Sequence, residues 1–269
     1  MMRNLSLAAG GLMVTLLLLL AAAGPHLAAT DPLAIDLGHA LAAPSQTHPL
    51  GCDALGRDLL ARTLWGARIS VGIAAAVVSV SMVLGCLIGG VSALAGGWAD
   101  ELLMRAVDVV LAFPGILLAI ALAAILGPGP VDLVIALAAM GWTGYARLVR
   151  GEILSLRELD YVKAAQGLGA SPARLLLFHL LPGVAAPLAV QASFGVGGII
   201  IAEAALSFLG LGIPPPQPTW GGMLDEGRAF LLVAPHLTTV PGLAIGLSVL
   251  GFNFLADGLA QLFGRRSLS

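Results

Sequence analysis

Six long apolar runs constrain this chain more than any other feature of its sequence. They cover residues 5–24, 69–94, 107–126, 131–149, 183–204 and 237–256. A helix needs about 20 mostly apolar residues to cross the hydrocarbon layer of a membrane. The chain is 58% hydrophobic and 10% charged, whereas an ordinary soluble domain has about 25% charged residues. We therefore predict an all-α integral membrane protein with six transmembrane helices.

The first apolar run also resembles a secretory signal peptide, because Arg3 precedes it and small residues follow it. Its length of about 20 residues exceeds the usual signal core of about 7 to 15 residues. We therefore expect a retained first helix. The expected organisation is a first helix plus outer loop over residues 1–68, a five-helix core over 69–257 and a cytoplasmic tail over 258–269.

The basic residues predict how the chain lies in the membrane. The polar segment 150–182 contains Arg150, Arg157, Lys163 and Arg174, and short loops rich in Lys and Arg stay in the cytoplasm. Six spans then place both termini on the cytoplasmic side as well. The long loop 25–68 and the proline-rich loop 207–236 are expected outside.

The composition excludes several classes of function. The only lysine, Lys163, lies in Tyr-Val-Lys-Ala-Ala and not in the glycine-rich pattern of a P-loop ATPase. A net charge of −2 without a long basic run argues against nucleic-acid binding. We find no nucleophile with a base and no metal-ligand spacing among the histidines and cysteines. An ion gradient or another subunit must therefore supply the energy.

Residues 150–182 predict a helix-turn-helix. A short helix over 159–168 is expected to end at Gly169, since glycine adopts the left-handed conformation that follows many helices. Ser171 can cap a second helix, and Pro172 suits its first position. We expect Pro182 to end this second helix. The two helices would form a projecting knob that either rests on lipid headgroups or docks another protein.

The sequence of this knob resembles the EAA loop of ABC importer permeases. The resemblance covers residues 161–171 and the Leu-Pro pair at 181–182. In that family the loop docks into a cleft of an ATPase subunit. Lys163 stands where the family usually has an acid, so we expect a partner surface of complementary charge. The resemblance assigns ATPase coupling to Lys163, Ala164, Ala165, Gly169, Ala170, Ser171, Leu181 and Pro182.

Two outer motifs are similar to one branch of that family, the second permease subunit of dipeptide, oligopeptide and nickel importers. Residues 48–58 are similar to its Leu-Gly-Thr-Asp-x-x-Gly-Arg-Asp signature, with Cys52 in place of threonine. Residues 203–212 are similar to its Glu-x-x-Leu-Ser-Phe-Leu-Gly-x-Gly signature, and a proline-rich stretch follows. The outer-loop residues in these motifs are Gly51, Asp53, Gly56, Arg57, Asp58, Trp220 and Gly221.

The charged residues in these motifs each have two readings. Asp53, Arg57 and Asp58 form a local ion-pair cluster or face a docking protein. Glu203, with Ser207 and Phe208 nearby, reaches the outer membrane interface, bonds a neighbouring helix or lines the translocation path, since a carboxylate is costly in lipid. Near the cytoplasmic boundary we expect an ion pair between Arg105 and Asp108 on one helix.

The resemblance implies a type I permease subunit of an ABC importer in the bacterial inner membrane. It would move peptides or a related small solute by alternating access. The implied partners are a homologous permease, two ATPase subunits and a periplasmic binding protein. No cofactor is expected on this chain, because ATP and Mg²⁺ would bind the ATPase subunits. The alternatives are transport of nickel or a metal chelate by the same machinery, or a gradient-driven transporter.

Overall fold

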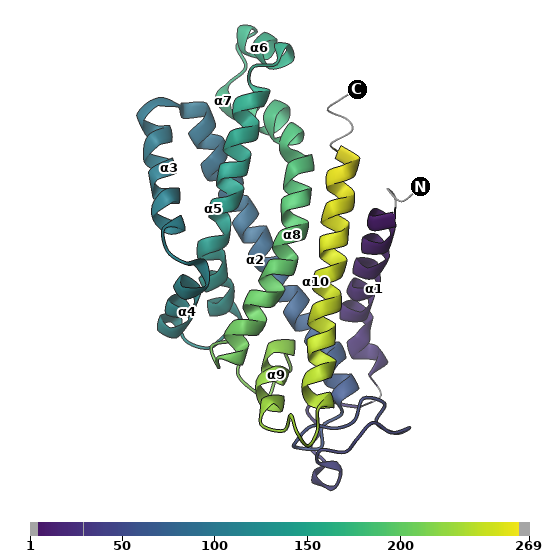
Figure 1. Cartoon of the computed structure of the whole chain (residues 1–269). Coiled ribbons are helices and arrows are strands. Elements are labelled where there is room, and N and C mark those ends of the chain that lie inside the picture. The colour runs from purple at the N-terminus through teal and green to yellow at the C-terminus, as the bar shows by residue number, and fades with distance from the viewer. Residues whose placement is uncertain (1–4, 29, 264–269) are drawn as a thin grey trace.

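The helices of the computed structural model lie side by side, with a projecting knob at one end and loops at the other (Figure 1). The structure describes residues 5–28 and 30–263. Within these ranges no strand is assigned, and the all-α fold class is confirmed. Five helices are long and apolar enough to cross a membrane. They are α1 (Leu5–Leu27), α2 (Leu59–Ala95), α5 (Pro130–Leu156), α8 (Leu181–Phe208) and α10 (His236–Phe263).

The third predicted span is broken. Helices α3 (Gly97–Leu111) and α4 (Gly115–Leu126) meet at 84°, so the span predicted over 107–126 is not one continuous helix. Pro114 explains the break, because proline donates no backbone hydrogen bond and disfavours a helical residue before it. The count of six spans holds only if this bent pair is one of them.

Helix α2 begins earlier than predicted. It starts at Leu59 rather than at residue 69, because the Asp58 side chain accepts a hydrogen bond from the amide of Ala61 at 2.8 Å and caps the helix. The loop predicted to lie outside is therefore shorter: its described part is residues 28 and 30–58, with a short 3₁₀ turn, η2 (Leu37–His39). With 37 residues, α2 is about 55 Å long, longer than the roughly 30 Å hydrocarbon layer.

Glycines bring α2 and α5 close together. A Cβ atom on Gly85 would lie 2.8 Å from the backbone nitrogen of Ala146, and one on Gly89 would lie 3.1 Å from that of Arg150. Side chains at these two α2 positions would collide with the α5 backbone. The Gly-x-x-x-Gly pair therefore serves helix packing, as small residues do in membrane proteins.

Helices α1 and α10 pack side by side in the same way (Figure 1). A Cβ atom on Gly10 would lie 2.6 Å from the carbonyl carbon of Phe254, and one on Gly258 would lie 2.7 Å from the Leu7 nitrogen. Helix α10 continues to Phe263, so the tail predicted from residue 258 is helical at its start. The predictions for Arg3 and for the last part of the tail, residues 264–269, fall outside the described residues.

The remaining elements lie at the two ends of the bundle (Figure 1). Helix α9 (Trp220–Arg228) lies at the end that carries the outer loop. Helix α6 (Asp160–Gly167), helix α7 (Pro172–Leu175) and the π-helical turn η3 (Leu176–Leu180) form the knob at the other end. Helix α1 begins and α10 ends at the knob end.

Candidate functional site

The knob is anchored by buried apolar side chains. Val162 from α6, Leu175 from α7 and Leu180 from η3 belong to one core cluster with α5 and α8. Gly169 joins the two halves with φ of 82°, a backbone conformation that suits glycine. The Ser171 hydroxyl accepts a hydrogen bond from the Arg174 amide at 3.4 Å and caps α7. The predicted helix-turn-helix therefore forms.

The residues of the EAA-like loop divide into an outward and an inward set. Ala164 and Gly169 are exposed, whereas Ala165 and Ala170 are half-buried and pack against the core. Leu168 at the turn is 89% exposed. The outward face of α6 thus has the small residues Ala164 and Gly167 beside the polar Lys163 and Gln166, and at the two small residues another protein could approach its backbone closely.

Lys163 has a local partner on the knob. Its Nζ lies 3.0 Å from Oε2 of Glu158. The hydrogen bond from Lys163 holds the pKa of the Glu158 carboxyl below its usual range. Both side chains are more than half exposed, so this pair contributes little stability. Lys163 therefore stays accessible at a position where the EAA family usually has an acid.

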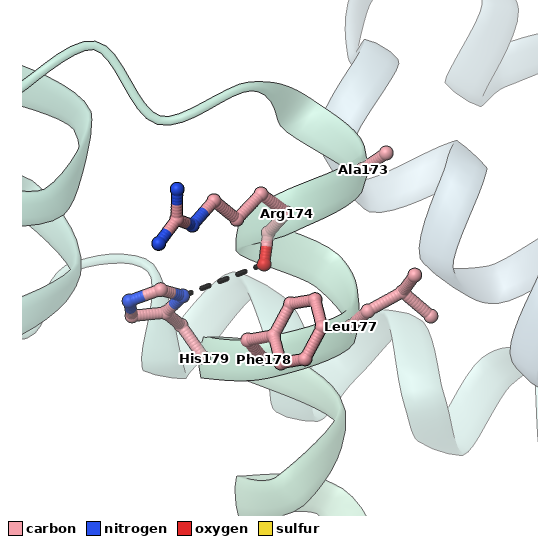
Figure 2. A pocket seen from close by; sticks show the side chains of 5 residues that line it. All are labelled: Ala173, Arg174, Leu177, Phe178 and His179. Carbon is pink, nitrogen blue, oxygen red and sulfur yellow. Dashed lines mark hydrogen bonds between the residues drawn. The ribbon is translucent and has the colours of Figure 1, made fainter.

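The second half of the knob carries a hollow of about 510 Å³ (Figure 2). Phe178 is 72% exposed at this hollow, and the His179 ring donates a hydrogen bond from Nδ1 to the Arg174 carbonyl at 3.4 Å. Ala173 and Leu177 complete its lining. Together with Leu168, the exposed Leu177 and Phe178 give the knob an apolar surface.

Pro182 does not end the second helix of the knob, contrary to the prediction. The chain passes from α7 through η3 into α8, a helical path over Pro172–Phe208. In η3 the amide of Leu181 bonds the carbonyl of Leu176, so the turn is one residue wider than an α-turn. Pro182 then occupies the first turn of α8, where a missing N–H is tolerated.

A buried ion cluster ties the outer loop to α2 and α9. Arg57 donates hydrogen bonds from Nε to Asp53 at 2.6 Å and from Nη2 to Glu226 at 2.8 Å. Arg62 also donates to Glu226 at 2.8 Å, and its Nε lies 3.3 Å from Asp53. The Arg62 side chain is 1% exposed and that of Glu226 is 30% exposed. The predicted pair of Asp53 and Arg57 is thus part of a larger structural cluster.

The other outer-loop residues shape the turn that leads into α2. Asp58 caps α2 and also lies 2.9 Å from Nδ1 of His48. Gly51 and Gly56 have φ of 83° and 73°. At Gly56 a side chain would also collide with the Asp36 carbonyl. These residues hold the loop together, and none of these contacts requires a docking protein.

Glu203 lies at a buried junction of α2, α8 and α9. Its side chain is 0% exposed and accepts hydrogen bonds from Ser207 at 2.8 Å and Ser70 at 3.2 Å. The Ser70 hydroxyl accepts a bond from the Trp220 amide at 3.3 Å. Gly221 packs against α8, where a Cβ atom would lie 2.6 Å from Cα of Ala204. Glu203 therefore bonds the neighbouring helix α2 inside the protein.

Phe208 does not join the Glu203 junction, and the ion pair predicted near the cytoplasmic boundary does not form. Phe208 is partly exposed under the Arg228 guanidinium, 5.3 Å from its ring centre. The predicted pair of Arg105 and Asp108 is wrong: Arg105 bonds Glu101 at 2.8 Å and Asp108 bonds Arg147 at 2.5 Å. Arg105 points back along α3 to the i−4 acid, which leaves Asp108 for the neighbouring helix α5.

Comparison with known proteins identifies the chain. Residues 81–268 match the family described as "Binding-protein-dependent transport system inner membrane component". The chain belongs to this family. It is thus a multi-pass permease of the bacterial inner membrane and a subunit of an ABC importer, and ATP hydrolysis belongs to other subunits.

Close relatives of this permease are named for glutathione transport. The chain is 47% identical to the glutathione transport system permease protein GsiD of Pectobacterium atrosepticum over 216 residues, which are 80% of this chain and 72% of the relative. It is 46% identical to GsiD of Shigella dysenteriae and 45% identical to GsiD of Escherichia coli O6:K15:H31, each over 80% of this chain and 71% of the relative.

Several ion pairs that stabilise the permease were not predicted from the sequence. Arg62 and Glu226 complete the outer ion cluster, and Asp100 pairs with Arg150 through two 2.6 Å hydrogen bonds that link α3 to α5. One signal was available for Arg62. An arginine within a long apolar helix needs an acidic partner, and the proline-rich outer loop supplies only Asp225 and Glu226 as acids.

Removing Glu226 from the permease tests the outer cluster. Glu226→Ala leaves Arg57 and buried Arg62 without their shared acceptor, so we expect a loss of about 2 kcal/mol of stability. Asp225→Ala is the matched control, because among the described residues Asp225 pairs only with Arg228, whose side chain is 61% exposed, and its loss should cost less than about 0.5 kcal/mol. Thermal unfolding of purified protein measures both. Equal midpoints for the two variants would contradict the structural role of the cluster.

Glu203 provides a second test of the buried contacts. Glu203→Leu leaves the hydroxyls of Ser70 and Ser207 without their acceptor, and we expect a loss of about 2 kcal/mol. Glu203→Gln keeps an acceptor and a donor at the same place and should lose less than half as much. The unfolding midpoints of the two variants give the comparison. A leucine variant as stable as the glutamine variant would show that these bonds contribute nothing.

Proposed function

We propose that this permease carries glutathione or a short peptide of similar chemistry inward, powered by two ATPase subunits, one of which binds its knob. The observation that carries the coupling role is the exposed EAA-like knob, in a chain that lacks a P-loop. The Ala164 face and the exposed Leu168 and Phe178 offer the small and apolar contacts that a cleft in another protein can enclose. The names of the GsiD relatives support a peptide substrate.

The proposal includes a second, homologous permease as partner. A single bundle with α2 packed behind α5 and α8 encloses little of a pathway, so two such subunits are needed to surround the solute. A periplasmic binding protein would deliver the solute to the outer loop and α9. Both termini would lie in the cytoplasm with the knob, in agreement with the basic residues of the knob segment. ATP and Mg²⁺ would bind the ATPase subunits, and this chain would bind no cofactor.

Transport would follow alternating access. ATP binding to the ATPase subunits would favour one state of the assembly, because these subunits contact the knob. ATP hydrolysis would release the assembly from that state. Helix α8 continues from the knob to the junction at Glu203, so movement of the knob is transmitted directly to a membrane helix. Because the chain belongs to a family of binding-protein-dependent importers, we do not propose the alternative of a gradient-driven transporter.

The substrate is tested on the binding protein that works with this permease. Titration calorimetry with glutathione, with a dipeptide and with a nickel chelate compares the three solute classes. We expect glutathione to bind and the nickel chelate not to bind. A binding protein that takes the nickel chelate and neither peptide would overturn the proposed substrate and leave the coupling role standing.

A further inference from the structure

A cavity of about 890 Å³ lies between α5, α8 and α10 at the knob end of the bundle. Its walls are mostly apolar, and two polar side chains, Glu152 and Gln191, line it. Gln191 lies about 15 Å along α8 from its start. The cavity therefore extends from the knob end to about the middle of the membrane helices.

The two polar side chains of this cavity are free to bind a solute. Within residues 5–28 and 30–263, the Glu152 carboxylate and the side-chain carboxamide of Gln191 make no hydrogen bond or ion pair, and only the backbone carbonyl of Gln191 accepts one, from the Tyr145 hydroxyl at 3.5 Å. The Gln191 amide nitrogen would lie 3.7 Å from a Cβ atom on Gly144 of α5, so it sits where α5 and α8 face each other. Ionisable and polar groups in membrane helices usually face protein or water, because exposure to lipid is costly.

The exposed faces of α1 and α8 differ in polarity, as expected if one faces lipid and the other faces water or protein. The outward face of α1 carries Leu12, Leu16 and Leu19, which suit a lipid environment. The outward face of α8 carries Gln191 and Gly198 on one stripe with Phe194, and the cavity opens on that side. The α8 face is therefore the one that borders a path for solute.

We propose that this cavity is the knob-side half of the peptide pathway, in which Glu152 receives the ammonium group of the substrate and Gln191 bonds its peptide groups. A carboxylate accepts the hydrogen bonds of an ammonium group, and a carboxamide donates and accepts as a peptide group does. The apolar walls suit the carbon atoms of a peptide. This inference rests on the proposed function and names the residues that recognise its substrate.

Uptake by the complete importer tests the proposal. The permease pair, ATPases and binding protein are reconstituted in liposomes, and the maximal rate of glutathione uptake is measured together with the ATP hydrolysed. For Glu152→Gln and Gln191→Leu we expect an uptake rate about tenfold lower, the effect of losing a hydrogen bond to a charged or peptide group. ATP hydrolysis stimulated by the binding protein should be retained, and Glu152→Asp should recover part of the uptake. Glu101→Gln is the control, because Glu101 lies on the surface of α3 and bonds only Arg105 among the described residues.

Thiol labelling gives a second readout that does not depend on transport. Cysteine is placed at Gln191, Phe194 or Leu16 in a chain whose Cys52 and Cys86 are replaced by serine. A charged, water-soluble maleimide should label the first two positions in the assembled importer and spare the Leu16 position. Equal protection of all three would show that lipid or the partner permease covers the cavity, and would overturn the proposal.

The uptake results separate this proposal from the proposed function. If the unmodified importer takes up glutathione and both Glu152→Gln and Gln191→Leu do so at the same rate, the pathway assignment alone is overturned. Absence of glutathione uptake by the wild-type importer overturns the proposed substrate, and the ligand assignment with it.

Discussion

Ala164→Trp is expected to abolish ATP-driven uptake while the permease still folds. Ala164 is exposed on α6 and packs against no core cluster, so an indole there adds bulk only to the outer face of the knob. A cleft shaped for a methyl group cannot accept it, and we expect at least a hundredfold loss of uptake. The measurements are uptake by the reconstituted importer and co-purification of the ATPase subunits with the permease.

A tryptophan elsewhere on the permease controls for bulk. Ala22→Trp places the same side chain on the exposed face of α1, near the end that carries the outer loop. Tryptophan is well tolerated near a membrane interface, so uptake and ATPase binding should be unchanged. If Ala164→Trp retained normal uptake and normal ATPase binding, the knob would not be the coupling site.

Gly85→Leu is expected to prevent folding of the permease. A side chain at this position meets Cβ of Tyr145 and the backbone nitrogen of Ala146, and a backbone contact cannot be relieved by a rotamer change. Overpacking costs about 1–3 kcal/mol even where neighbours can shift, and here α5 itself would have to move. The yield of monodisperse protein in detergent, measured by size-exclusion chromatography, should fall at least tenfold.

The same helix supplies a matched control. Gly72 lies on α2 with open space around its Cβ position, so Gly72→Leu adds apolar surface without a collision. We expect its yield to match that of the unmodified permease, and its helix propensity to favour folding slightly. Similar yields for the two leucine variants would contradict the close packing of α2 and α5.

The sequence predicted those parts of the fold that depend on local chemistry. Run lengths predicted the membrane helices, and Gly169 with Ser171 predicted the turn of the knob. The break at Pro114 and the early start of α2 were missed, although both have local signals. The continuous path through Pro182 could not be predicted, because the π-helical turn depends on how Leu175 and Leu180 pack in the core.

The candidate site residues likewise divide into those predictable from neighbouring residues in the sequence and those that depend on distant contacts. The exposed face of the knob was predictable from the EAA-like motif, since the family pattern lies in adjacent residues. The contacts of Glu203 and the shared acceptor of Arg57 and Arg62 were not, because Ser70 and Glu226 are distant in sequence. The cavity at Glu152 and Gln191 depends on three helices and has no sequence signature.

The most direct test of the account measures glutathione uptake in liposomes that contain either this permease alone or the complete importer. The complete importer, with its partner permease, two ATPase subunits and binding protein, should accumulate glutathione against a gradient only when ATP is present. This permease alone should accumulate none. Accumulation by the single chain, or by the complete importer without ATP, would contradict the claim that motor subunits drive it through the knob.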